Sequence, residues 1–463
     1  MKFKIQLTIV NPDDGKESTE EITLLDKQNE RLEDIGLSLQ ESKNILKSLQ
    51  EKIVNYQTDD FVQGKRSCGK CQKSCRIKGS HPIVFRTLFG DLPIKSQRFY
   101  TCDCTEQEQK TFSPLKELLT DYTSPEKMYL ETKWASTIPF GKTVNLLKDV
   151  LPISNKLSAS TVGNHLHKVA QKEESELKEK RFAFVEGCQL QWDELPRPDG
   201  TIVVGLDGGY LRSWENKKKH FEVIAGKSIP RDQADKFFAF VDTYEPSKPK
   251  RRLYEVLKSQ GMQFNQEIEF LSDGATNLHQ LQRYLNPLSK HYLDWFHITM
   301  KITVLKQYLK GILKVDKDLG EEQLHFLEKV KWYLWHGNIH KALTYLSFLE
   351  DVESLECEYT HWKGFQKHAA EFISYIKNNK GLITNYGERY QNGEIFTTSF
   401  TESTINEVVA RRFCKKQQMQ WSKKGAHLLL VTRAKVLNGE LVDCFKKWYP
   451  NLKIEQKEVK KAA

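Results

Sequence analysis

Two aspartates have the setting that metal-dependent chemistry requires. Asp207 and Asp273 each end an apolar strand pattern and each precede a glycine. If the two strands are neighbours in one sheet, their carboxylates lie close enough to share divalent cations, and Mg²⁺ prefers carboxylate oxygens and water. Two such ions can activate water and stabilise the leaving oxygen of a phosphodiester. One Asp-Gly pair after a strand is an ordinary turn, so the interpretation depends on the two sites together.

A third carboxylate is available further along the chain. Glu402 and Glu407 lie in one segment that reads as a helix. Glu402 and Asn406 are four residues apart and share a helix face, whereas Glu407 faces elsewhere. We therefore favour Glu402 and keep Glu407 as the alternative. Asp207, Asp273 and Glu402 are the predicted ligands of Mg²⁺ (or Mn²⁺).

A histidine and an aspartate lie at the end of the fifth expected strand. His297 follows Asp294 by three residues. A single histidine in such a place is more often a packing or hydrogen-bonding residue than a ligand. The pair could also position a scissile phosphate or the neighbouring acids, so both residues are catalytic candidates.

Two pairs of cysteines have the spacing of a zinc-ribbon-like site; they are Cys68, Cys71, Cys102 and Cys104. A predicted hairpin separates the pairs, and turns would bring four thiolates into the tetrahedron that Zn²⁺ prefers. The ion would supply folding energy that a small core lacks. The second pair is tighter than in a regular zinc ribbon, and Cys75 and His81 could substitute as ligands. A metal-free thiol cluster is the alternative.

A basic segment directly follows the helix of the third acid. Its candidate DNA-binding residues are Arg411, Arg412, Lys415, Lys416, Gln417, Trp421, Lys423 and Lys424. Lys and Arg neutralise phosphates, while Gln and Trp can contact bases or stack on an unpaired one. A solvated helix face is the alternative, but the place of the segment after Glu402 favours a groove for a DNA strand.

The elements that must position these residues predict an α/β core. From Thr201 the pattern is three strands, a helix, a strand, a helix and a fifth strand. Antiparallel strands followed by parallel ones with intervening helices match a ribonuclease-H-like fold. We expect this core over residues 186–299 and 395–440, with an all-helical insertion over 300–394.

The rest of the chain predicts further parts. Residues 1–60 contain a strand and a long helix with a weak Leu/Ile heptad, either a coiled-coil arm or a helix packed on its own domain. Residues 61–110 hold the cysteines, and 111–185 read as a helical DNA-binding domain with a helix-turn-helix-like pair. Many ordinary helical hairpins have the same pattern. Residues 441–463 are expected to form a basic tail.

Composition narrows the class of partner. The chain has 463 residues, with 71 Lys and Arg against 61 Asp and Glu, for a net charge of +10. This excess favours a polyanion such as nucleic acid, and 24 Phe, 17 Tyr and 9 Trp can fill real cores. The start of the chain lacks the pattern of a signal peptide and no run is long enough to cross a bilayer. We therefore expect a cytoplasmic protein with reduced cysteines and no membrane partner.

Several segments, taken in order, resemble those of ISKra-type bacterial insertion-sequence transposases, within the wider DDE transposases. The resemblance runs over roughly residues 60–440 and rests on Cys68–Cys71, Arg86–Asp91, Tyr129–Ser136, Val144–Pro152, Ala159–Leu166, Leu206–Tyr210, Leu271–Ala275, Leu293–Ile298 and Lys416–His427. It implies a ribonuclease-H-like core whose helical insertion precedes the third acid. Related mutator-like and hAT transposases have Cys or Asp, two residues, then His after the fifth strand, which Asp294 and His297 match.

The resemblance also implies an activity: metal-dependent DNA cleavage and strand transfer of an insertion sequence. The partner would be double-stranded DNA, as terminal inverted repeats and as target, in the bacterial nucleoid. The cysteine segment and the helices after it would bind the repeats, and paired ends imply a homodimer or a higher oligomer. A transposase-derived, non-catalytic DNA-binding regulator and a structure-specific nuclease are the competing functions.

Overall fold

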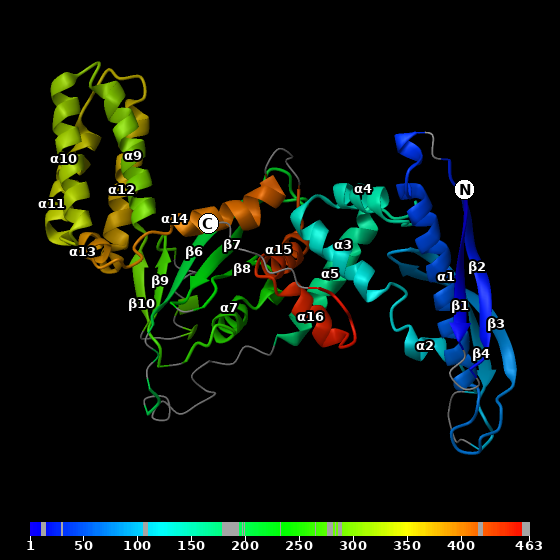
Figure 1. The fold of residues 1–463 in the computed structure, drawn as a ribbon. Helices are drawn as coiled ribbons and strands as arrows, with labels where there is room; N and C mark the ends of the chain where they lie inside the picture. Colours follow the sequence, from blue (N-terminus) through cyan, green and yellow to red (C-terminus); the bar gives the residue numbers. More distant parts are fainter. Residues whose placement is uncertain are drawn as a thin grey trace. The chain divides into compact units, whose positions relative to one another are not determined.

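The computed structural model divides into two compact units, residues 1–169 with 440–463 (unit 1) and residues 170–439 (unit 2). It is a mixed α/β structure (Figure 1). The residues it describes are 1–10, 15–28, 31–104, 110–177, 194–196, 198, 200–231, 233–263, 265–275, 281–282, 284–285, 289–414 and 420–455. For a few residues inside helices only the backbone is described, Glu402 among them.

Unit 1 begins with a hairpin and a long helix. Strands β1 (Lys2–Val10) and β2 (Glu17–Asp26) pair antiparallel, and helix α1 spans Leu39–Gly64. The helix begins later than its Leu/Ile pattern indicates, because Ser38 and Glu41 form a capping box that satisfies the first backbone N–H groups. The apolar residues of the pattern that precede Ser38 therefore lie outside the helix.

A three-stranded sheet carries the cysteine segment of unit 1. Strands β3 (Ile77–Thr87), β4 (Gly90–Tyr100) and β5 (Thr111–Phe112) pair antiparallel in that order. The hairpin predicted between the two cysteine pairs is therefore present. Leu92 and Phe99 of β4 are buried with Val54 and Val62 of α1, so the helix and the sheet share one small core.

Helices complete unit 1: α2 (Leu115–Leu118), α3 (Pro125–Thr137), α4 (Phe140–Val150), the first part of α5 (Ala159–Glu176) and α16 (Leu441–Trp448). The expected basic tail thus begins with a packed helix. Leu441, Val442 and Phe445 are buried at helical spacing, and the Phe445 ring contacts Tyr129 of α3 at a centroid distance of 5.4 Å.

The sheet of unit 2 has five strands in the order β10-β9-β6-β7-β8. They span Ile202–Arg212 (β6), His220–Ile229 (β7), Lys236–Phe240 (β8), Ile268–Ser272 (β9) and Lys290–Leu293 (β10). The first three strands are antiparallel, and β9 pairs parallel with both β6 and β10. The first and fourth strands of the unit are neighbours, as the candidate acids require.

Helices cover both faces of this sheet. Helix α7 (Pro249–Lys258) buries Leu253 and Leu257 against β6 and β9. The other face is covered by α14 (Ser399–Thr404), a π-helical segment at Ile405–Cys414, and α15 (Lys423–Leu437). Such π-helical stretches are rare and are frequently found at functional sites.

The predicted helical insertion is a bundle with a core of its own. It contains α9 (Trp295–Ile312), α10 (Lys317–Trp335), α11 (Ile339–Glu350), α12 (Trp362–Asn378) and α13 (Tyr386–Gln391). It begins earlier than expected: β10 ends at Leu293, and Asp294 caps α9 by accepting a hydrogen bond from the Phe296 N–H. The sequence prediction of a strand through His297 is therefore wrong. None of the described helices combines the length and apolar character that crossing a bilayer demands.

Candidate active site and metal centre

Asp207 and Asp273 belong to neighbouring strands, and Asp273 directly follows the end of β9. Strand β6 continues beyond Asp207 to Arg212, because these residues pair with β7, so the prediction that Asp207 ends its strand is wrong. Gly205 of β6 is paired with Leu271 of the parallel strand β9. Asp207 comes two residues after Gly205 and Asp273 two residues after Leu271, so both acids lie on the same face of the sheet. Asp207 accepts a hydrogen bond from the Gly208 N–H at 2.7 Å, and Asp273 accepts one from the Ala275 N–H at 3.0 Å. The backbone therefore orients both carboxylates.

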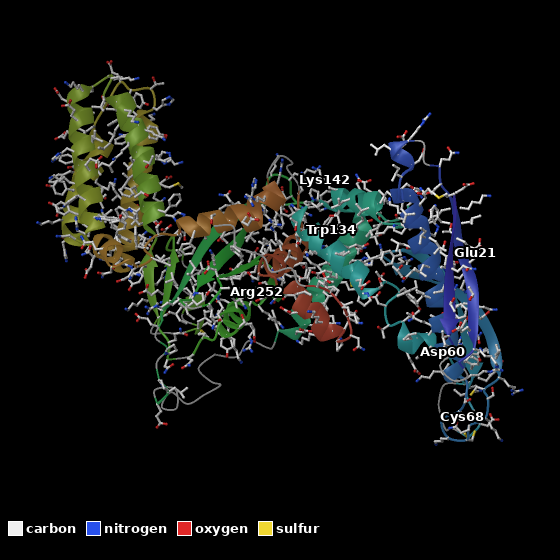
Figure 2. All side chains as sticks on the ribbon, viewed as in Figure 1. Glu21, Asp60, Cys68, Trp134, Lys142 and Arg252 are labelled. Atoms are coloured by element: carbon white, nitrogen blue, oxygen red, sulfur yellow. The ribbon has the colours of Figure 1, made fainter. Side chains whose placement is uncertain are left out.

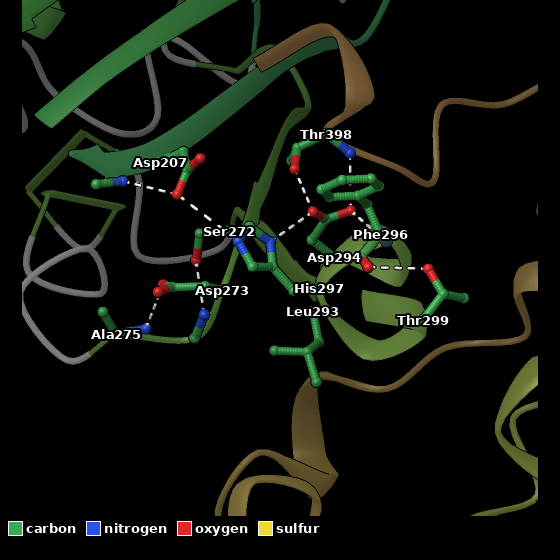
Figure 3. A network of polar contacts seen from close by, with 12 residues as sticks. Asp207, Ser272, Asp273, Ala275, Leu293, Asp294, Phe296, His297, Thr299 and Thr398 are labelled. Carbon is green, nitrogen blue, oxygen red and sulfur yellow. Dashed lines mark hydrogen bonds and ion pairs between the residues drawn. The ribbon is translucent and has the colours of Figure 1, made fainter. Parts of the chain in front are cut away.

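Asp294 is a buried junction between segments that are distant in the sequence (Figure 3). One carboxylate oxygen accepts hydrogen bonds from the backbone N–H of Phe296 at 3.0 Å and of Thr398 at 2.8 Å. The other accepts from the Thr398 hydroxyl and from Nδ1 of His297, the latter at 2.8 Å. Four donors from three residues therefore hold this carboxylate in place. Asp294 thereby joins the start of α9 to the segment that leads into α14.

His297 lies between two acids. Its Nδ1 donates to Asp294, and its Nε2 lies 3.7 Å from Oδ1 of Asp207 (Figure 3). Burial alone would lower the pKa of His297, but the hydrogen bond to Asp294 and the charges of Asp294, Asp207 and Asp273 outweigh it and raise this pKa. Burial also raises the pKa of Asp207, against the opposing charge of His297. The histidine is thus oriented by one carboxylate and partly compensates the charge of another.

The two candidates for the third acid differ in their surroundings. Helix α14 packs against β6 and β7, and this brings the backbone of Glu402 to the Asp207 face of the sheet; its side chain lies outside the described atoms. The Glu407 carboxylate forms ion pairs with Arg411 and with the buried Arg433, the latter at 3.7 Å. Because two guanidinium groups already compensate its charge, Glu407 is the poorer metal ligand.

Sequence reasoning missed one acid near this site. Glu222 of β7 places Oε1 only 2.7 Å from the position that a Cβ on Gly208 would occupy. Burial raises the pKa of Glu222, and the charges of Asp273, Asp242 and Asp207 raise it further. The available signal was the Gly-Gly pair after Asp207, which leaves room above the neighbouring strand.

Some side chains of the predicted DNA-binding segment are buried and others are exposed. Arg412 and Trp421 are buried, with the guanidinium 5.5 Å from the indole centroid, and backbone hydrogen bonds tie Trp421 to the end of β6. Burial and the charge of Arg433 lower the pKa of Arg412 to about 10. These two side chains therefore pack inside unit 2 and do not present a surface to DNA.

The remaining members of the segment are exposed or outside the description. Arg411 is exposed; Lys423 and Lys424 lie in the first turn of α15, where Lys423 is half-buried and Lys424 is exposed. Lys415, Lys416 and Gln417 fall outside the described residues. The accessible positive charge of the segment is thus carried by Arg411, Lys423 and Lys424 among the residues that the structure describes.

The four cysteines form a group that can hold a metal ion such as Zn²⁺. All four Sγ atoms lie within 4.8 Å of one another, and Cys68 is labelled in Figure 2. The Sγ atoms of Cys68 and Cys104 are 3.4 Å apart, as are those of Cys71 and Cys102. A zinc–sulfur bond of about 2.3 Å gives a tetrahedron with edges of about 3.8 Å. The sulfur positions therefore match a tetrahedral site and are too far apart for disulfides.

Local backbone structure favours the thiolate form of Cys68, whereas the neighbouring cysteines raise the pKa of Cys104. The backbone N–H groups of Cys71 and Lys70 lower the pKa of Cys68 to about 6, and the thiolate is the form that binds metal. Cys75 is buried in the core between α1 and β4, and His81 is exposed on β3; neither joins the group. The prediction of these four cysteines as a group is confirmed. Among the described side chains it is the one set of three or more His, Cys, Asp or Glu with metal-binding spacing.

Comparison with known proteins gives no further assignment. The chain matches no protein-family model and no curated protein.

Proposed function

We propose that this protein is a DDE transposase with a ribonuclease-H-like core, which cleaves DNA and transfers strands with the help of divalent metal ions. The observation that carries the proposal is the placement of Asp207 and Asp273 on one face of adjacent parallel strands, with His297 between Asp207 and Asp294. Three antiparallel strands followed by two parallel ones support the proposed core. The resemblance to ISKra-type transposases agrees with both.

The donor set suits a hard cation. Asp207, Asp273 and Glu402 would hold Mg²⁺ or Mn²⁺ through carboxylate oxygens. When bound there, such ions activate water, or a freed 3′-hydroxyl, and stabilise the leaving oxygen of a phosphodiester. His297 would hold a proton at Nδ1 against Asp294 and present Nε2 toward Asp207, which fixes that carboxylate. Asp294 orients the His297 ring through its hydrogen bond to Nδ1, and it also caps the start of α9.

Unit 1 has features that suit binding of the terminal repeats. At the start of α5, the Ser158 hydroxyl lies 2.9 Å from that of Ser160 and 3.0 Å from that of Thr161; Ser158 and Ser160 are exposed and Thr161 is half-buried. Hydroxyl and N–H groups at a helix N-terminus are suited to phosphate contact. Glu131 of α3, buried with its ion pair to Lys127 at 2.7 Å, also contacts His165 of α5 and fixes the two helices together. We assign the repeat-binding role to these helices and the cysteine segment.

The test is strand joining. A labelled duplex that carries the sequence flanking the gene is incubated with a supercoiled target plasmid, wild-type protein and Mg²⁺ or Mn²⁺. We expect nicks at the ends and then labelled DNA joined to the plasmid through its 3′-ends. Asp273→Asn should abolish both products, and Glu371→Gln, an exposed acid of α12, should retain both. Metal-dependent nicks without joining by wild type would indicate a nuclease instead.

A DNA-binding regulator built on the same core is the second candidate. The observation behind it is that Nε2 of His297 lies 3.7 Å from Oδ1 of Asp207, where a charged histidine would compete with a metal ion for that carboxylate. A regulator predicts tight binding to the flanking repeats with no cutting, even with Mn²⁺ and paired ends. Cutting lost in Asp273→Asn would exclude it.

A further inference from the structure

A pocket of about 370 Å³ lies on the helical bundle, between the start of α9 and one face of α10. Its lining residues are Trp295, Glu328, Lys331, Trp332 and Trp335. Counted from Glu328, the other three residues of α10 follow at three, four and seven positions, which places all four on the same side of that helix. Ligand pockets in proteins have volumes of about 300–1,000 Å³, so this one is large enough for a small planar group.

Packed aromatic rings form the back wall of the pocket, and one further indole, that of Trp332, is exposed. Trp295 is 9% exposed, and its ring centroid lies 5.0 Å from that of Trp335 and 4.8 Å from that of the buried Tyr386. Trp332 is 61% exposed on the same face of α10. Packing with Tyr386 holds the back wall in place, whereas the Trp332 ring offers its surface to a ligand.

The rim of the pocket is positively charged. Glu328 is paired with Lys306 of α9, so its charge is already compensated, and Lys331 adds a further positive charge. Indole surface next to a cation suits a ligand that has both a flat π-system and a negative charge. A nucleotide has both, and every base can stack on an aromatic ring.

The pocket shares a chain segment with the candidate acid site. Trp295 directly follows Asp294 and precedes His297 by two residues, all at the first turn of α9. The first turn of α9, which forms the back of the pocket, therefore also carries Asp294 and His297 of the candidate acid site.

We propose that this pocket binds an unpaired nucleobase of the DNA strand held at the acid site, with the base stacked on Trp332 and the adjoining phosphate near Lys331. The inference rests on the proposed function for its choice of polymer. It adds a specific preference: the protein should bind unpaired DNA through this pocket, with little dependence on base identity.

The experiment measures binding alone, with the full chain and no added divalent ion. The probes are fluorescein-labelled oligodeoxythymidine of about 20 nucleotides, longer than a single-strand site of about 4–16 nucleotides, and a duplex of the same length. Fluorescence anisotropy gives the dissociation constant for each. We expect Trp332→Ala to weaken binding to the single strand about tenfold or more and to leave duplex binding unchanged, because loss of base stacking affects unpaired DNA only.

Matched variants complete the design. Trp332→Phe keeps an aromatic surface and should restore most of the affinity, and Lys331→Ala should weaken single-strand binding and reduce its salt dependence. Phe348→Ala removes another exposed aromatic residue of the bundle, 42% exposed on α11, and should change neither probe. Trp332 is exposed, so its replacement leaves the fold intact, which circular dichroism checks.

Two results would overturn the inference: wild-type protein that does not bind the single strand, or Trp332→Ala that binds it as tightly as wild type. Cleavage is not read in this assay. Protein that binds unpaired DNA through Trp332 but never cuts DNA would refute the proposed catalysis and leave the pocket assignment standing.

Discussion

Arg389 of α13 and Glu269 of β9 form a buried ion pair that anchors the helical insertion to the sheet. Their side chains are 8% and 10% exposed, and the two terminal guanidinium nitrogens, Nη1 and Nη2, both donate to the carboxylate. The guanidinium also lies 4.2 Å from the ring centroid of Tyr292 on β10. Since β9 leads directly into Asp273, we expect Arg389→Met to loosen the strand that carries the acid.

The size of the effect follows from burial. Removing one partner of a buried pair leaves an uncompensated charge and costs about 3–5 kcal/mol, or about two to three and a half orders of magnitude in the local opening equilibrium. The double variant Arg389→Met/Glu269→Leu removes both charges and should recover most of that loss. The pair therefore predicts strong non-additivity between the two positions.

Hydrogen–deuterium exchange, read by mass spectrometry on peptides from β9 and α13, measures this opening locally. Lys377→Met is the control, because Lys377 pairs with Glu350 in the same bundle at 2.7 Å with both side chains 46% exposed. An exposed pair contributes about 0–1 kcal/mol. If Arg389→Met speeds exchange in these peptides no more than Lys377→Met does, the anchoring role is refuted.

Three further predictions concern the site and the cysteine group. Thr398→Val removes a hydroxyl donor to Asp294 and should destabilise unit 2 by about 1.5–3 kcal/mol, while Thr398→Ser should not; denaturant titration of both variants checks this. Metal analysis should find about one zinc per wild-type chain and much less in Cys104→Ser, which removes one ligand of the group. Cys357→Ser, which changes a cysteine outside the group, should leave the zinc content unchanged; equal content in all three proteins would contradict a zinc site at the four cysteines. The folded-state pKa of His297 is raised above 6.5, so its stabilising charge is fully present below that pH and is lost as pH rises through the raised pKa. The stability difference between metal-free wild type and His297→Asn should therefore be largest in mild acid and shrink with rising pH.

Much of the sheet and its acid edge could be predicted because the signals are local. Apolar runs mark β6 and β9, and their parallel pairing follows from the strand order. The end of β6 could not be predicted, because its pairing with β7 carries the strand past Asp207 to Arg212. The cysteine group and its hairpin could also be predicted, because the spacing of the cysteines and the alternation of polar and apolar residues are properties of short segments.

Other features depend on contacts between distant residues. Asp294 looked like the end of a strand, but its side chain caps α9 and binds Thr398, which lies 104 residues further on. Arg412 and Trp421 are residue types that often contact DNA, yet they pack on each other inside unit 2. Composition shows that a residue can contact DNA, whereas only the fold shows whether it is exposed.

Cleavage of end-labelled DNA is the most direct test of the central claim that Asp207 and Asp273 form a metal-dependent DNA-cutting site. The substrate carries the sequence that flanks the gene, and the reaction is run with and without Mg²⁺ for wild type and Asp207→Asn. We expect cuts at the element ends by wild type that require the metal and disappear in Asp207→Asn. Equal cutting by both proteins, or none by wild type with Mg²⁺ or Mn²⁺ on paired ends, would contradict it.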